Sequence, residues 1–132
     1  MQINMLSIFT GRFVPMRAFY RDVLGMTITV DHEDHYVEFA GQGVRLAICE
    51  RAVMQRLGLS AGYDNPAQGQ AFGLAFECSC AEDVNRRLAE LVDAGAERIA
   101  VGNRMPWGQY TAFFADPDGH IHELFARLGE TT

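Results

Sequence analysis

The residue types best suited to chemistry gather near the end of the chain, in the stretch FFADPDGHIHELF at positions 113–125. His120, His122 and Glu123 fall within four residues there, just after an aspartate-rich turn. Imidazole and carboxylate groups are frequent ligands of divalent metals. A catalytic metal usually needs about three protein ligands, so this cluster raises the question of a metal site.

Strand geometry separates the members of this cluster. The residues after the Asp-Pro-Asp-Gly turn have the pattern of a β-strand, in which successive side chains point to opposite faces. Glu123 therefore shares one face with Ile121 and Phe125. His120 and His122 share the other face. The three groups cannot chelate one ion together.

The elements that position this stretch occur twice along the chain. Each half has a strand-like segment, an amphipathic helix and three further strand-like segments. The first predicted helix covers residues 14–25, and the second covers residues 79–95, where Ser79 and Glu82 form a capping-box pattern. The predicted strands cover residues 3–10, 26–30, 35–40, 44–50, 71–78, 96–101, 109–115 and 120–126. The sequence thus predicts an α+β fold of two tandem β-α-β-β-β modules.

The length of 132 residues suits one domain, with module one at about 1–50 and module two at 71–127. Residues 51–70 join the modules. AVMQRL, at 52–57, predicts a short helix, and the turn-forming residues of 60–70 predict a surface loop. A loop of this length is either a linker or a functional lid, and we favour the linker.

Composition excludes several classes of function. The net charge is −6 and no basic stripe is present, which argues against nucleic acid as a partner. No uninterrupted apolar run is long enough to span a bilayer, and the first residues lack the pattern of a secretion signal. The three cysteines have spacings that suggest reduced thiols. We therefore expect a cytoplasmic protein.

Two motifs carry a resemblance to a known family. FYRDVLGM at 19–26 and DPDGHIHELF at 116–125, within the tandem module pattern, resemble the vicinal-oxygen-chelate superfamily. Its members include glyoxalase I, extradiol dioxygenases, fosfomycin-resistance enzymes and bleomycin-resistance proteins. The resemblance covers nearly the whole chain. It implies a homodimer whose sheets curl around a ligand-binding cleft, with the helices outside.

The resemblance also implies where a metal would be held. The family's ligand positions correspond to Met5, Ala47, Gly73 and Glu123 in this sequence. A thioether is a soft, weak donor for the hard divalent ions that these enzymes use, and alanine and glycine offer no donor at all. Only Glu123 is a good ligand. We therefore expect neither a metal nor another cofactor.

Without a metal, the cleft is expected to be a small-molecule site. The expected ligand-binding residues are Phe9, Arg45, Trp107, Gln109, Phe113 and Glu123. The Pro-Trp-Gly at 106–108 is similar to a loop of bleomycin-resistance proteins, which implies that its tryptophan stacks on a flat ligand. A lone tryptophan more commonly packs in a core or an interface. The arginine and the glutamate could equally form a structural ion pair.

These features favour a metal-independent protein that sequesters an aromatic or antibiotic-like molecule. The alternative is a metal-dependent lyase, isomerase or dioxygenase of the glyoxalase type. Glu123 acting as a base without a metal would give a further enzyme, and a non-catalytic module is a third interpretation. The sequence therefore leaves enzymatic activity open.

Overall fold

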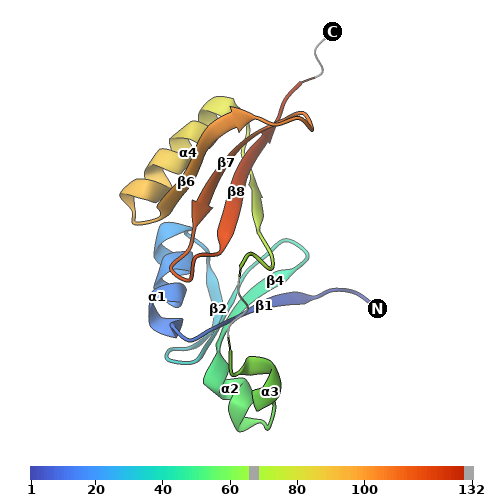
Figure 1. The fold of residues 1–132 in the computed structure, drawn as a ribbon, viewed down its shortest axis with the longest axis vertical. Helices are drawn as coiled ribbons and strands as arrows, with labels where there is room; N and C mark the ends of the chain where they lie inside the picture. The colour runs from blue at the N-terminus through green and yellow to red at the C-terminus, as the bar shows by residue number, and fades with distance from the viewer. Residues whose placement is uncertain (66–68, 130–132) are drawn as a thin grey trace. The chain divides into compact units, whose positions relative to one another are not determined.

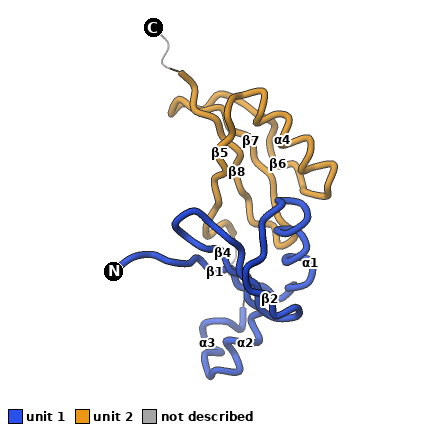
Figure 2. The backbone as a smooth tube through the Cα atoms, turned by 180° about the vertical axis from the view of Figure 1, so that it is seen from behind, with its two compact units in different colours: residues 1–68 blue, residues 69–132 orange. Residues whose placement is uncertain are grey.

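The computed structural model describes residues 1–65 and 69–129 of the chain. These residues belong to two compact units, residues 1–68 (unit 1) and 69–132 (unit 2), which Figure 2 distinguishes by colour. Each unit contains one four-stranded sheet with a helix against one of its faces. The predicted α+β class and the repeated module pattern are confirmed.

The sheet of unit 1 has the strand order β1-β4-β3-β2, in which β1 runs parallel to β4 and the other pairs are antiparallel (Figure 1). Its strands are β1 (Met5–Thr10), β2 (Ile28–His32), β3 (Tyr36–Phe39) and β4 (Arg45–Glu50). Every strand lies within two residues of its predicted bounds, because the apolar-polar alternation follows the pleat.

The predicted helix at 14–25 forms as an α-helix, α1 (Phe13–Ala18), that continues into a π-helical turn, η1 (Phe19–Val23). Its apolar stripe is buried against the sheet, where Met16, Phe19 and Tyr20 are at most 5% exposed. Gly25 ends the helix with a φ of 70°, a left-handed conformation that glycine adopts at little cost.

The segment after β4 belongs to unit 1. The predicted short helix is present as α2 (Arg51–Arg56). The prediction of a loop over 60–70 is wrong at its start, where α3 (Ser60–Tyr63) forms, and residues 66–68 of that range lie outside the described part. The Tyr63 ring packs edge-on against Phe9, with ring centroids 4.7 Å apart, and this contact holds α3 to β1.

Unit 2 repeats the arrangement with the strand order β5-β8-β7-β6. Its elements are β5 (Ala75–Glu77), α4 (Ala81–Asp93), β6 (Glu97–Arg104), β7 (Gln109–Ala115) and β8 (Ile121–Arg127). Figure 1 shows α4 lying along one face of the sheet. On that face Val84 and Leu88 of the helix are buried, as are Ala112, Phe114 and Leu124 of the strands.

Two local predictions in unit 2 need correction. The capping partner of Ser79 is Asp83 rather than Glu82, because α4 begins at Ala81 and its third residue reaches back to the Ser79 amide at 3.1 Å. The strand predicted over 71–78 is shortened to β5, because side chains replace its first backbone pairs, as described below.

The predictions about membranes and thiols can be compared with the described residues. No helix among them has the length and apolar character needed to cross a membrane. Cys49, Cys78 and Cys80 are all free thiols. The interpretation of the cysteines as unpaired is confirmed.

Candidate functional site

The face of each sheet opposite α1 or α4 is called its inner face. In unit 1 the inner face carries Met5, Ser7, Phe9, Tyr36, Glu38, Arg45, Ala47 and Cys49. In unit 2 it carries Ala75, Glu77, Gln109, Thr111, Phe113, Ile121, Glu123, Phe125 and Arg127. Five of the six expected ligand-binding residues lie on one of these two faces, and Trp107 does not.

The histidines of the C-terminal cluster have structural surroundings. His122 is fully buried on the helix side of β8, with its ring centroid 5.7 Å from that of Phe114. Its Nδ1 accepts a hydrogen bond from the Leu74 amide at 3.1 Å, and its Nε2 lies 3.5 Å from Asp116 Oδ2. The predicted separation of His122 from the face of Glu123 is confirmed.

Asp116 organises the turn that precedes β8. One carboxylate oxygen accepts hydrogen bonds from the amides of Asp118 and His120, each at 3.0 Å. The other lies 2.9 Å from the Nδ1 of His120. Because the Asp116 side chain is fully buried, these bonds satisfy a group that would otherwise be costly to bury.

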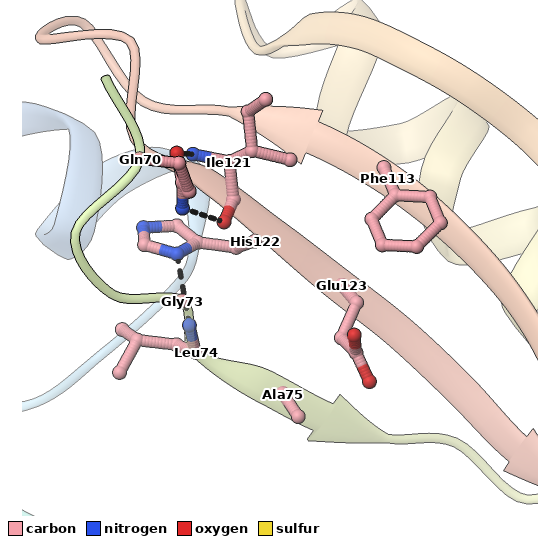
Figure 3. A pocket seen from close by; sticks show the side chains of 8 residues that line it. All are labelled: Gln70, Gly73, Leu74, Ala75, Phe113, Ile121, His122 and Glu123. Atoms are coloured by element: carbon pink, nitrogen blue, oxygen red, sulfur yellow. Dashed lines mark hydrogen bonds between the residues drawn. The ribbon is translucent and has the colours of Figure 1, made fainter.

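Unit 2 contains a pocket of about 430 Å³ at the start of β8 (Figure 3). It is lined by Gln70, Gly73, Leu74, Ala75, Phe113, Ile121, His122 and Glu123. Small-molecule sites in proteins typically measure about 300 to 1,000 Å³, so the pocket suits a ligand of modest size. The buried His122 side chain lies on the far side of the sheet, which leaves Ala75, Phe113, Ile121 and Glu123 as the inner-face side chains of the wall.

Gln70 fixes one end of this pocket. Its side-chain amide forms the two hydrogen bonds to the Ile121 backbone that a residue of a neighbouring strand would otherwise form. Its Nε2 donates to the Ile121 carbonyl at 2.8 Å, and its Oε1 accepts from the Ile121 amide at 3.0 Å. The same Nε2 also contacts the Phe72 carbonyl. Figure 3 shows the two bonds between Gln70 and Ile121. Together the three bonds use the Nε2 and the Oε1 of the side chain. Sequence reasoning missed Gln70, because a glutamine in a turn-rich segment carries no signal of such a role.

Glu123 is the one carboxylate of the pocket. Figure 3 shows its side chain directed away from Gln70 and Ile121. Phe113 stands directly opposite it on β7. Glu123 is half-buried, yet its carboxylate has no hydrogen bond or ion pair with any residue in the described ranges 1–65 and 69–129. A half-buried charge without a partner is unusual and marks a candidate binding group.

Unit 1 carries a different polar group on its inner face. Arg45 donates from Nη1 to Glu38 Oε1 at 2.6 Å and from Nη2 to the side chain of Asn4. Tyr36 donates its hydroxyl to the other oxygen of Glu38 at 2.6 Å. Burial, together with this hydrogen bond, raises the pKa of Tyr36 to about 12. Sequence reasoning identified Arg45 but missed Glu38 and Tyr36. Alternating polar residues on a short strand are equally typical of a solvent-exposed sheet face, so they gave no signal of this cluster.

Trp107 and Phe9 are not among the residues that line this pocket. Trp107, in the turn between β6 and β7, is 62% exposed and donates from Nε1 to Gln109 at 3.2 Å. It is therefore not a core residue of this chain. Phe113 is six positions after Trp107, which corresponds to at most about 20 Å of extended chain. Phe9 lies on the other unit, against Tyr63.

The donor set at the family's metal positions does not fit a metal. Met5 Sδ lies 3.6 Å from the Tyr36 hydroxyl, and Ala47 is fully buried. A Cβ on Gly73 would lie 3.1 Å from the Ile121 carbonyl, so a larger ligand residue would crowd the backbone there. In the part of the chain that the structure describes, no three histidine, cysteine, aspartate or glutamate side chains are grouped to hold a metal ion.

Comparisons with known proteins agree with this architecture. A family model described as Glyoxalase/Bleomycin resistance protein/Dioxygenase superfamily matches residues 2–124. A glyoxalase/bleomycin resistance protein/dioxygenase family enzyme from Burkholderia phytofirmans PsJN has a TM-score of 0.85 at 20% identity, covering 97% of this chain and 100% of that one. A glyoxalase/bleomycin resistance protein/dioxygenase from Nocardioides has a TM-score of 0.84 at 23% identity, covering 100% and 90%.

A third solved structure, a lactoylglutathione lyase from Agrobacterium tumefaciens, has a TM-score of 0.73 at 20% identity, covering 94% of this chain and 92% of that one. A search of curated proteins found no match. At these identities the three solved structures share their fold with this chain.

Proposed function

Since the chain belongs to the glyoxalase/bleomycin resistance protein/dioxygenase superfamily, we propose that it binds and sequesters a small, partly aromatic molecule without a metal. The observation that carries this proposal is the lack of a protein partner for the Glu123 carboxylate among the described residues. This carboxylate is half-buried, in a pocket that is otherwise mainly apolar.

The chemistry of the family's ligand positions supports the metal-free part of the proposal. Met5, Ala47 and Gly73 together offer one soft donor, and Glu123 offers one hard donor. A catalytic metal usually takes about three protein ligands, which these positions do not supply. The one retained carboxylate is therefore available to a ligand of another kind.

The make-up of the pocket supports binding of an organic molecule. Phe113 and Ile121 present apolar surface beside a single charged group, the usual composition of a small-molecule site. Gln70 holds Ile121, the first residue of β8, through two hydrogen bonds, so this wall is organised before a ligand arrives. Preorganisation of this kind favours affinity, because less conformational entropy is lost on binding.

Native mass spectrometry of the purified, unheated protein tests this function directly. Spectra recorded with and without added nickel, manganese or zinc would give the mass of the assembly, of any bound metal and of any retained organic molecule. We expect the cytoplasmic homodimer to carry no stoichiometric metal. The Glu123→Gln variant serves as a matched control, because it removes the charge while keeping the shape of the side chain.

The same experiment decides between the proposal and its alternative. One metal per chain, lost on addition of a chelator and absent from the Glu123→Gln variant, would overturn metal-independent binding. That result would favour a metal-dependent enzyme of the glyoxalase type. The observation that supports this alternative is that Glu123 is retained at one of the family's ligand positions. A metal-free protein that retains an organic mass would support sequestration and would identify the ligand.

A further inference from the structure

The charge of the unit 2 pocket narrows the class of ligand. We propose that this pocket selects an organic cation, a protonated amine attached to a small flat apolar group. This inference rests on the proposed function, because it takes the pocket to be a binding site, and it adds the chemistry that decides which molecules the pocket accepts.

The first argument is the balance of charge around Glu123. The nearest cation along its own strand is Arg127, four residues away, which corresponds to about 13 Å. Arg127 is itself paired with Glu77, with 3.3 Å between Nε and the carboxylate. A half-buried carboxylate is stabilised most by a cation that also donates hydrogen bonds to it. A ligand ammonium group supplies both.

The second argument is the lack of donors for other ligand classes. The Nε2 of Gln70 already donates to the carbonyls of Phe72 and Ile121. The side chains of Leu74, Ala75, Phe113 and Ile121 have no polar atoms. A ligand carboxylate or phosphate would therefore find repulsion from Glu123 and no side-chain donor in exchange, whereas a cation meets an unused acceptor.

The third argument is the position of Phe113. It forms a cross-strand pair with Glu123 on the inner face, and such pairs have Cβ atoms about 4.5 to 5.5 Å apart. A cation held by the carboxylate therefore comes within reach of the phenyl ring, which favours cations electrostatically and flat apolar groups by contact. The net charge of −6 on the whole chain adds a weak general attraction for cations.

Three ligands of nearly equal shape test the selection by charge: phenethylamine, 2-phenylethanol and phenylacetate. Their dissociation constants for the full chain would be measured by ligand-observed NMR at neutral pH. We expect the amine to bind about tenfold tighter than the alcohol, since a charge-assisted hydrogen bond adds about 1.4 kcal/mol or more. Phenylacetate is expected to bind more weakly than the alcohol.

Matched variants assign the selection to the pocket. Glu123→Gln is expected to bring the amine and the alcohol to equal affinity. Glu77→Gln removes a carboxylate from the same inner face outside the pocket, and it is expected to leave the tenfold preference unchanged. Phe113→Leu is expected to weaken the amine and the alcohol together. Thermal unfolding of each variant confirms that it is folded.

The outcomes separate this inference from the proposed function. Equal binding of the amine and the alcohol would overturn selection of a cation, and a preference that survives in Glu123→Gln would overturn its assignment to Glu123. Either result leaves small-molecule binding intact. If none of the three ligands binds and the native protein retains no organic mass, both the selection and the proposed function are wrong.

Discussion

The two inner faces of this protein place their carboxylates differently within the same repeat. In unit 1 the carboxylate is Glu38 on β3, and the residue opposite it on β4 is Ala47. In unit 2 the carboxylate on the equivalent strand pair is Glu123 on β8, and the residue opposite it on β7 is Phe113. The pair β3 and β4 in unit 1 is equivalent to the pair β7 and β8 in unit 2. The carboxylate lies on the first strand of the pair in unit 1 and on the second strand in unit 2.

The surroundings of the two carboxylates differ more than their positions. Glu38 has a side chain 12% exposed, and both of its oxygens accept hydrogen bonds, from Arg45 and Tyr36. Glu123 has no such partners in the described residues. A satisfied charge contributes to the structure of the sheet, whereas an unsatisfied one is available to a ligand. Repeated modules can therefore share a fold while dividing structural and binding roles.

The largest expected difference concerns two glycines beside turns. A Cβ on Gly41 of unit 1 would lie 2.0 Å from the Val44 carbonyl oxygen, so the backbone must move. Gly41→Ala is expected to lower the free energy of unfolding by about 2 to 3 kcal/mol. Gly73→Ala in unit 2 meets the Ile121 carbonyl at 3.1 Å and is expected to cost about 1 kcal/mol or less. Denaturant unfolding measures both, and equal costs would contradict this ranking.

The second comparison tests the two carboxylates directly. Glu38→Gln removes the charge of a largely buried carboxylate that accepts hydrogen bonds from Arg45 and Tyr36, and we expect a loss of about 1 to 2 kcal/mol in the free energy of unfolding. Glu123→Gln removes a charge without a partner and is expected to change stability by less than about 0.5 kcal/mol. Urea titrations of both variants provide the measurement. A larger loss for Glu123→Gln would show that its charge has a structural role.

The third comparison uses two buried threonines. Thr10 in unit 1 accepts a hydrogen bond from the Arg12 amide at 2.9 Å, so Thr10→Val is expected to cost about 1 kcal/mol. Thr111 in unit 2 is fully buried, and its hydroxyl has no partner in the described part of the chain. Thr111→Val is expected to be neutral or to stabilise by up to about 1 kcal/mol. Melting temperatures of the pair would reveal opposite shifts; a shared direction would contradict the assignment.

The smallest expected effect is on titration in unit 1. The pKa of Tyr36 is about 12, above its ordinary value of 10.0, so the folded state holds the phenolic proton more tightly than the unfolded state does. Its contribution to stability is therefore present below about pH 10 and is lost as the pH rises through about 12. Phenolate absorbance of the wild type minus that of Tyr36→Phe should show this late titration. A midpoint near 10 would mean that the hydrogen bond to Glu38 is weak.

The fold was predictable because its strands follow simple alternation and its helices end in glycine. The run 109–115 became β7 with the predicted bounds, and Gly25 ended the first helix as expected. The start of β5 was not predictable in this way. There the Leu74 amide bonds the side chain of His122, and the backbone of Ile121 on β8 bonds the side chain of Gln70. The partners in each pair are remote in sequence and leave no periodic pattern.

The candidate site was predictable only in part, for a related reason. Glu123 and Phe113 emerged from alternation, and the structure places them opposite each other. Whether a charge such as Glu123 or Arg45 has a partner depends on contacts between strands, which one sequence does not specify. The prediction that Trp107 and Glu123 contact the same ligand stays untested.

The hydrogen bonds of Gln70 have a consequence for how such a protein could change its specificity. The mouth of the pocket is held by a side chain rather than by a backbone ladder. Substitutions at this one position can therefore reshape the entrance while every strand of the sheet keeps its register. Ligand preference could then diversify through the residue at position 70 while the sheet stays the same.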